Sequence, residues 1–216
     1  GHKVTDSFTG ILLDLGVSSF QLDTPGRGFS FRADAEADMR LNPREGVPAW
    51  KFIEQSDTET LTTVVRDYAE EPRYRAIVQA LEKAKGTPEL RTTLGLSKII
   101  SYHVRGHRTI HPATRVFMGL RMAVNREVER LTAALPWAFG QLQAGGVLAV
   151  ISFHSVEDRV VKLFCKKLIT PKDEACAKLL IKKVGKPTFG EKTQNARARS
   201  AKLRAVEKIS DYDQNS

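Results

Sequence analysis

The hydrophobic positions of the chain form short continuous runs near both ends and helix-like repeats in between. Residues 9–14 and 147–153 are apolar runs of strand length, each followed by polar or turn-forming residues. Residues 201–206 suggest a third strand, and Gly145 with Gly146 predicts a turn before the second. Because a continuous apolar run is typical of a parallel strand covered on both faces, we expect the first two strands to be buried.

The segment between the first two strands is more polar and has the period of amphipathic helices. Apolar residues recur there three or four positions apart in three groups, and no strand pattern interrupts them. The groups lie at residues 61–68, 77–81 and 94–100. We therefore predict an inserted all-helical sub-domain at residues 32–108, within a core that residues 1–31 and 109–216 form.

A longer apolar stripe runs from Phe117 to Leu135 and predicts one long helix. Pro112 suits the first turn of this helix, and Pro136 should end or kink it. Residues 157–168 again have a helical pattern. Strands and helices in this order favour an α/β fold with a parallel sheet, in which ligands bind beyond the carboxyl ends of the strands.

Polar residues follow the first two predicted strands, where such folds bind ligands. Asp14 ends the first strand, and its carboxylate can accept hydrogen bonds from an amine of a ligand or from backbone N–H groups in a turn. Gln21 can contact a polar ligand edge or be a surface amide. His154 can touch a substrate or fix its turn with a hydrogen bond. A Ser–His–Asp hydrolase is not favoured, because the chain has no Gly-x-Ser-x-Gly motif.

Other polar positions are candidates for contacts with an anion or a substrate. His111 and Arg115 open the long predicted helix, whose N-terminus is a natural anion site. Asn125 lies on the same helix away from the apolar stripe, either on the substrate side or as plain surface. Arg197 and Arg199 alternate in a loop before the last strand, a pattern that suits phosphate contacts.

The charge of the chain is concentrated near its C-terminus. The net charge is +9, and residues 161–208 hold 14 Lys or Arg against four Asp or Glu. This region suggests a polyanionic partner such as RNA, DNA or an acidic membrane surface, or else a solvated lysine-rich helix and tail. No run approaches the ~20 apolar residues of a membrane helix. Two cysteines and histidines without ligand spacing predict no disulfide, no metal site and a reducing compartment.

Six segments of the chain form a specific set of motifs. They are Gly10-Ile-Leu-Leu-Asp-Leu-Gly-Val-Ser-Ser-Phe-Gln-Leu-Asp23, Arg27-Gly-Phe-Ser-Phe31, Ala37-Asp-Met-Arg40, His111-Pro-Ala-Thr-Arg115, Gly146 through Ser152-Phe-His-Ser-Val-Glu-Asp-Arg159 and Ala196-Arg-Ala-Arg-Ser-Ala-Lys-Leu-Arg204. In this order they resemble the ribosomal small-subunit RNA cytosine-N4 methyltransferases of the RsmH/MraW type. The resemblance spans nearly the whole chain.

The resemblance implies a Rossmann-like, S-adenosylmethionine-dependent methyltransferase core with an inserted helical domain. It implies methylation of the exocyclic N4 of a cytidine in small-subunit rRNA, on a flipped or single-stranded base. It also implies that Asp14 and Gln21 contact the cofactor. Many amino-methyltransferases have an Asp/Asn-Pro-Pro-aromatic motif where this chain has Asp14-Leu-Gly-Val. The resemblance therefore does not identify the groups that hold the acceptor amine.

The resemblance also sets expectations about partners and extent. We expect small-subunit rRNA or the ribosomal subunit as partner, no membrane or metal, and a cytoplasmic enzyme, with the mitochondrial matrix as the alternative. The family begins with a strand, a Gly-rich loop and an acid on the cofactor ribose, and only about a dozen residues precede Asp14 here. We therefore expect a partial chain whose first strand has an unpaired edge. The alternatives are a non-catalytic RNA-binding module without the cofactor half, or a methyltransferase of DNA or of another rRNA site.

Overall fold

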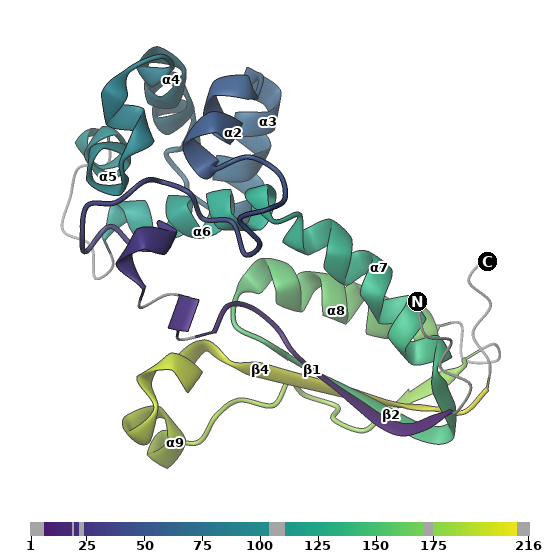
Figure 1. The fold of residues 1–216 in the computed structure, drawn as a ribbon. Coiled ribbons are helices and arrows are strands. Elements are labelled where there is room, and N and C mark those ends of the chain that lie inside the picture. The colour runs from purple at the N-terminus through teal and green to yellow at the C-terminus, as the bar shows by residue number, and fades with distance from the viewer. Residues whose placement is uncertain (1–6, 19, 22–23, 104–110, 171–174, 211–216) are drawn as a thin grey trace. The chain divides into compact units, whose positions relative to one another are not determined.

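A computed structural model describes residues 7–18, 20–21, 24–103, 111–170 and 175–210 of the chain. The contacts within the chain divide it into two compact units (Figure 1). The first, the sheet unit, comprises Gly1–Gly16 and Val128–Ser216. The second, the helical unit, comprises Val17–Glu127.

The sheet unit contains a mixed sheet, whose described strands follow the order β1-β2-β4-β3. The strands are β1 (Phe8–Asp14), β2 (Leu142–Ser152), β3 (Ala177–Leu179) and β4 (Lys202–Lys208). β1 and β2 are parallel, whereas β4 is antiparallel to both β2 and β3. The three predicted strands are confirmed, but the expectation of a parallel sheet holds for β1 and β2 alone. The three-residue β3 was not predicted, because so short a strand shows no clear period.

Two helices of the sheet unit cover one face of the sheet, α7 (Glu127–Gly140) and α8 (Ser155–Leu168) (Figure 1). The helix predicted from residue 157 is therefore confirmed as α8. A hydrophobic core lies between these helices and the sheet. Its buried members include Leu135, Phe139, Val150, Val161, Leu168 and Val206. A short helix, α9 (Phe189–Gln194), and a 3-10 helix, η5 (Ala196–Ser200), precede β4.

β1 lies at the edge of the sheet that the described strands form, and the expectation that it is buried on both faces is wrong. Ile11 and Leu13 pack on the core beneath α7 and α8. Leu12 points to the opposite face of the sheet and is 63% exposed. Because side chains alternate across a strand, the apolar run places only every second residue of β1 in the core.

Gly145 and Gly146 lie inside β2, so the turn predicted from them is wrong. Gly145 has a positive φ of 81°, and the register between β1 and β2 shifts between Phe8 and Gly10. A Cβ at Gly146 would lie 2.9 Å from the carbonyl oxygens of Phe8 and Gln143. The two glycines therefore allow the backbones to approach at an irregular start of the ladder instead of ending the strand.

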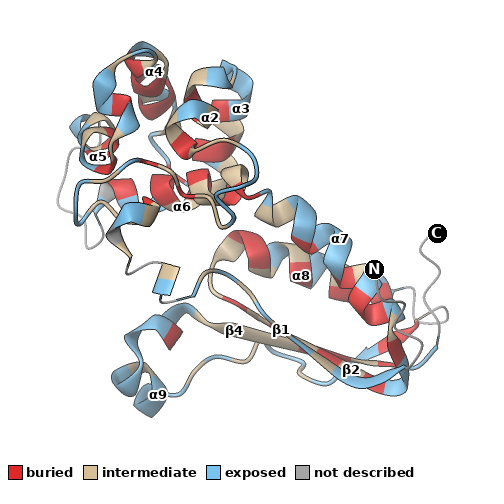
Figure 2. Ribbon diagram, in the orientation of Figure 1, coloured by how far each residue is buried: buried red, intermediate tan, exposed pale blue. Residues whose placement is uncertain are grey.

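The helical unit consists of short helices around its own hydrophobic core (Figure 2). Its described elements are η1 (Pro25–Arg27), α2 (Ala49–Gln55), α3 (Thr58–Thr63), the π-helical η2 (Val64–Tyr68), α4 (Tyr74–Ala84), η3 (Pro88–Arg91), α5 (Thr93–Tyr102) and α6 (Pro112–Val124). The three groups of helically spaced residues lie in α3 with η2, in α4 and in α5. Ile77, Leu81 and Ile100 of these groups are fully buried. A Cβ at Gly119 of α6 would lie 2.8 Å from the carbonyl oxygen of Val64, so glycine permits close packing of α6 on η2.

The long helix predicted from the stripe between Phe117 and Leu135 is two helices, and that prediction was wrong. α6 ends at Val124, and Arg126 adopts a left-handed backbone with a φ of 51° before α7 begins. α7 continues through Pro136 to Gly140, so the proline does not end it. The stripe misled the prediction because apolar residues keep helical spacing on both sides of the break.

Among the helices that the structure describes, none combines the length and the apolar character that crossing a membrane requires.

Candidate functional site

The carboxyl ends of β1 and β2 lie side by side in the sheet unit. Asp14 is the last residue of β1 and is paired in register with Ile151. Just beyond this pair, the Leu15 N–H donates to the carbonyl oxygen of Ile151 at 3.0 Å. Asp14 is exposed at this end of the sheet. The two motifs that follow the first two predicted strands therefore start from neighbouring points, where the Asp14 carboxylate is open to a ligand.

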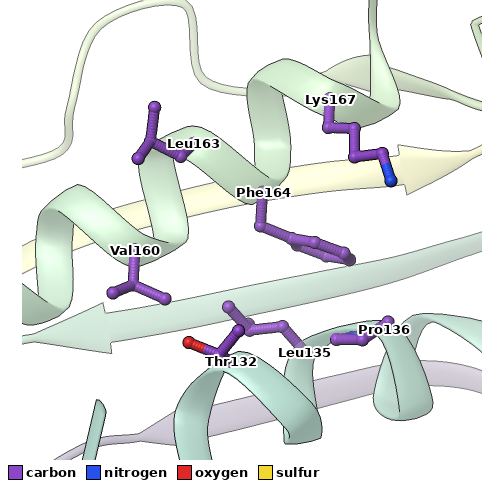
Figure 3. Close-up of a pocket in the computed structure, with 7 residues that line it drawn as sticks. All are labelled: Thr132, Leu135, Pro136, Val160, Leu163, Phe164 and Lys167. Carbon is purple, nitrogen blue, oxygen red and sulfur yellow. The ribbon is translucent and has the colours of Figure 1, made fainter. Parts of the chain in front are cut away.

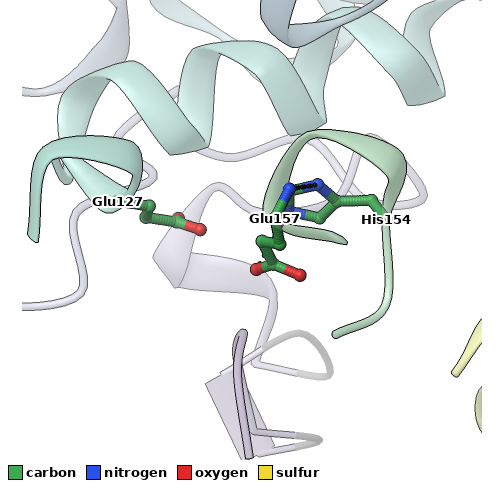
Figure 4. Close-up of side chains that lie close together, drawn as sticks. All are labelled: Glu127, His154 and Glu157. Atoms are coloured by element: carbon green, nitrogen blue, oxygen red, sulfur yellow. Dashed lines mark hydrogen bonds and ion pairs between the residues drawn. The ribbon is translucent and has the colours of Figure 1, made fainter. Parts of the chain in front are cut away.

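His154 follows β2 and is the N-cap of α8 (Figure 4). Its Nδ1 accepts a hydrogen bond from the backbone N–H of Glu157 at 3.4 Å. Its Nε2 lies 3.0 Å from Oε1 of Glu157, although the two atoms are not aligned for a hydrogen bond. The other carboxylate oxygen of Glu157 accepts from the N–H of Phe153 at 3.1 Å. His154 therefore fixes the strand-to-helix turn, as one of the two interpretations of the sequence proposed.

Asp158 joins the first turn of α8 to β4. Its carboxylate accepts hydrogen bonds from Arg204 Nε at 2.7 Å and from Lys202 Nζ at 3.2 Å. Burial by itself would raise the pKa of Asp158, but the hydrogen bonds from Arg204 and Lys202 outweigh burial and hold the pKa below its ordinary value. Asp158 therefore stays ionised, and its negative charge is neutralised inside the sheet unit.

Arg197 and Arg199 lie in η5, directly before β4, and both are exposed. The predicted loop is thus a short 3-10 helix, capped by Asn195, whose Oδ1 accepts from the N–H of Arg197 at 3.1 Å. Because β4 is antiparallel to β2 and pairs Lys202 with Ser152, its start lies beside the end of β2. The structure therefore brings both arginines to the end of the sheet that holds Asp14 and His154 (Figure 1).

Gln21 belongs to the helical unit, where it forms a reciprocal cap with Ser18. The Ser18 N–H donates to Oε1 of Gln21 at 3.0 Å, and the Gln21 N–H donates to Oγ of Ser18 at 3.3 Å. This Ser-x-x-Gln arrangement is a capping box, which was not predicted although its spacing is visible in the sequence. The cap uses the amide oxygen of Gln21, so the amide N–H groups are what the side chain can offer a ligand.

His111 and Arg115 lie at the start of α6 in the helical unit, as predicted. His111 is the N-cap, and its Nδ1 accepts from the N–H of Ala113 at 3.2 Å. Its ring packs 4.6 Å from the ring of Phe31, measured between centroids. The guanidinium of Arg115 is exposed and donates to the carbonyl oxygen of Glu70 at 3.5 Å. His111 thus uses one ring nitrogen for the helix, and Arg115 presents a cation beside it.

Asn125 is buried, so its interpretation as plain surface is wrong. Its Nδ2 donates to the carbonyl oxygens of Met39 and Arg121, both at 2.8 Å, and its Oδ1 accepts from the N–H of Leu41 at 2.7 Å. Met39 has a φ of 61° and is fully buried. Asn125 therefore ends α6 and holds an unusual backbone segment more than 80 positions earlier in the chain, a pairing that helical period alone cannot indicate.

Both cysteines are free and buried in the sheet unit. Burial raises the pKa of the Cys165 thiol to about 11. Burial also raises the pKa of Cys176. Because the thiolate is the reactive form, burial lowers the reactivity of both thiols.

The predicted site residues are divided between the two units. Asp14, His154, Arg197 and Arg199 come together at one end of the sheet. Gln21, His111, Arg115 and Asn125 lie in the helical unit, at the turn around residue 18 and at the two ends of α6.

The sheet unit defines a mixed α/β protein consistent with a methyltransferase fold, with an exposed acid at the carboxyl end of a parallel strand. The family model described as the MraW methylase family matches residues 2–209. The chain belongs to this family.

Curated relatives agree with the family assignment. The chain is 43% identical over 214 residues to the ribosomal RNA small subunit methyltransferase H of Hydrogenovibrio crunogenus. It is 43% identical over 199 residues to the protein of the same name from Coprothermobacter proteolyticus, and 42% over 214 residues to that from Thermomicrobium roseum. These alignments cover 93%, 92% and 93% of this chain and 68%, 66% and 65% of the respective relatives. The chain therefore spans about two thirds of the length of these relatives.

Proposed function

We propose that this protein transfers the methyl group of S-adenosylmethionine to the exocyclic N4 of a cytidine in small-subunit ribosomal RNA. Membership of the MraW methylase family and relatives named as ribosomal RNA small subunit methyltransferases support this reaction. The structural observation that carries the proposal is Asp14, an exposed carboxylate at the carboxyl end of β1, beside the end of β2. In this proposal the helical unit is an insertion in the methyltransferase core.

The chemistry of Asp14 and Gln21 fits the cofactor that we propose. Within the part of the chain that the structure describes, the Asp14 carboxylate is not engaged in an ion pair, so it can accept hydrogen bonds from an amine or hydroxyl of the cofactor. Gln21 complements it, because its amide N–H groups can donate while its oxygen maintains the cap with Ser18. When bound, S-adenosylmethionine supplies a methyl group on a sulfonium centre, which an amine attacks in line.

The residues of the protein act mainly by positioning in this proposal. A cytosine N4 is a weak nucleophile, because its lone pair is delocalised into the ring. Holding the amine and the cofactor in line and excluding water can contribute about 7–11 kcal/mol. We assign the substrate side to His111 and Arg115, and phosphate contacts to Arg197 and Arg199. His154 supports this chemistry through the turn that it fixes. Asn125, which uses its whole amide group inside the helical unit, supports this side through the fold rather than by contact.

Calorimetric titration of S-adenosylmethionine into the chain, with Asp14→Asn alongside, tests the cofactor site. We expect binding by the wild type and a loss of at least about tenfold in Asp14→Asn, since one charge-assisted hydrogen bond is worth about 1.5–3 kcal/mol. Glu129→Gln, at an exposed carboxylate of α7 in the same unit, is the matched control and should bind as the wild type does. Mapping of the methylated nucleotide in small-subunit rRNA then tests the acceptor.

A second candidate function, RNA binding without catalysis, is favoured by the many exposed cations of the C-terminal half. A folded chain that binds rRNA but does not bind S-adenosylmethionine would support this second function and would contradict a cofactor site in these residues. If the wild type binds both ligands and Asp14→Asn loses the binding of S-adenosylmethionine alone, the methyltransferase function is supported.

A further inference from the structure

An apolar groove lies between α7 and α8 on the outer side of the sheet unit (Figure 3). Its volume is about 490 Å³. Leu135 and Pro136 of α7 face Val160 and Phe164 of α8 across it, and Lys167 lies at one end. Leu163 of α8 also lines the groove. Leu163 is 59% exposed, although it is a large hydrophobic residue. Exposed apolar surface that is bordered by charge is typical of a binding site.

The exposed charges of α8 are all positive. Arg159, Lys162, Lys166 and Lys167 are exposed along its outer side. The two acids of the helix are used inside the sheet unit. Glu157 is buried and accepts from a backbone N–H of its own turn, and Asp158 is paired with Lys202 and Arg204. Because these acids are used inside the sheet unit, the charges that α8 exposes beside the groove are cationic.

The Lys167 end of the groove lies away from the end of the sheet that holds Asp14. The C-terminal end of α8 is connected to the start of β2 through a chain of hydrogen bonds: Cys176 N–H to Leu168 O at 3.0 Å, Ile209 N–H to Cys176 O at 2.8 Å, and Lys208 Nζ to Leu142 O at 2.7 Å. Leu142 begins the 11-residue β2, whose other end is beside Asp14. A strand of this length spans roughly 30 Å. A ligand at the Lys167 end of the groove therefore does not reach the cofactor position.

We propose that this surface, the apolar groove together with a rim formed by Lys162, Lys166 and Lys167, docks small-subunit rRNA at a distance from the methylated nucleotide. The inference rests on the proposed function, which supplies RNA as the partner. The cations contact phosphates, and the groove receives an unstacked base, whose flat apolar faces pack between Pro136 of α7 and Phe164 of α8. RNA satisfies both features of the surface, because it is the one component of the proposed substrate that combines a dense negative backbone with apolar ring faces.

The test compares two RNA probes and two sets of variants. The long probe is a small-subunit rRNA fragment that contains the methylated cytidine and its flanking helices, and the short probe is a single-stranded oligonucleotide of the few nucleotides around that cytidine. The triple variant Lys162→Gln, Lys166→Gln, Lys167→Gln, called the rim variant, removes three positive charges from the rim. Lys51→Gln, Lys83→Gln, Lys98→Gln in the helical unit removes the same number of exposed charges and is the matched control. Binding is measured by fluorescence anisotropy at several salt concentrations.

The expected result is specific for the long probe. The rim variant should bind it roughly tenfold or more weakly at 0.1 M salt. The slope of log affinity against log salt should also be smaller in magnitude by about 2, since each phosphate contact contributes about 0.7–0.9 to that slope. Its affinity for the short probe and for S-adenosylmethionine should match that of the wild type. Leu163→Glu, at an exposed position, should lower the affinity for the long probe, because it places a negative charge on the lining of the groove.

Equal affinities of the rim and control variants for the long probe would overturn the inference and leave the proposed function standing. An unchanged affinity in Leu163→Glu would overturn the assignment of a base to the groove. Absence of binding of any rRNA probe by the wild-type chain would instead overturn the rRNA substrate of the proposed function.

Discussion

Arg204 and Asp158 are 46 positions apart in the chain and form a two-point contact, with Nε 2.7 Å from Oδ1 and Nη2 3.2 Å from Oδ2. The contact joins the middle of β4 to the first turn of α8. The side chain of Asp158 is only 13% exposed. A charge pair so little exposed is costly to break on one side, because the remaining charge has no partner in a region of low polarity.

Asp158→Asn should therefore destabilise the protein by about 1–3 kcal/mol at pH 7, since Arg204 and Lys202 both lose an ionised partner. Urea unfolding followed by circular dichroism measures the change. Glu129→Gln, which removes an exposed carboxylate from the same unit, should change stability by less than about 0.5 kcal/mol. A loss in Asp158→Asn no larger than in this control would contradict the contribution of the pair.

The destabilisation of Asp158→Asn should also depend on pH. The pKa of Asp158 is lowered in the folded protein, so the folded state holds the ionised form more strongly than the unfolded chain does. The stability from the pair is fully present above the unfolded pKa of about 3.9 and is lost as the pH falls through the lower folded value. The difference between wild type and variant should be constant from pH 6 to 8 and shrink below about pH 4.

Gln21→Glu separates the structural function of Gln21 from the cofactor contact that we propose. A carboxylate keeps the acceptor oxygen that caps the Ser18 N–H but removes the amide donors. Thermal unfolding should therefore change little, whereas the affinity for S-adenosylmethionine should fall by about tenfold. Ser18→Ala is the reverse control: it removes one hydrogen bond of the box and should cost about 0.5–2 kcal/mol with a smaller effect on cofactor affinity. Equal cofactor affinity in Gln21→Glu and wild type would exclude the contact.

The order of strands and helices was predictable because it depends on local period and on turn residues. The start of α8 is an example: Ser155 and the acids Glu157 and Asp158 predict a helix N-terminus, and the structure places it there. The position of Asp14 at the end of β1 was predictable for the same reason. The specific function that we propose came from the resemblance of six ordered segments, since a strand-end acid by itself fits many enzymes.

The features that were not predicted depend on contacts between distant segments. The partners of Asp158 lie on β4, and no local pattern connects them. Whether Leu12 is exposed depends on which face of the sheet has helices, and the apolar run alone does not show this. The break after Asn125 depends on hydrogen bonds to Met39 and Leu41, which belong to a segment far away in the sequence.

Cys165 should be nearly inert to alkylation in the folded protein. Burial raises its pKa to about 11, so the thiolate is a very small fraction of the thiol at pH 8. Iodoacetamide labelling followed by mass spectrometry should show slow modification in buffer and a rate like that of a free cysteine in denaturing urea. Rapid labelling of the folded chain at Cys165 would show that this part of the core opens. Cys176, which is also buried, should respond in the same direction.

Asn125→Ala should be among the most destabilising polar substitutions in the helical unit. It leaves the carbonyl oxygen of Met39 and the N–H of Leu41 buried without their partner, and each such group costs about 1–3 kcal/mol. Asn125→Asp is the informative companion, because it keeps the acceptor for Leu41 but cannot donate to Met39 and places a charge at a site only 7% exposed. Hydrogen exchange should show faster exchange at residues 39–41 in both variants, while the protection of β2 and β4 in the sheet unit stays as in the wild type. Uniform loss of protection across both units would show instead that Asn125 stabilises the whole chain rather than the helical unit.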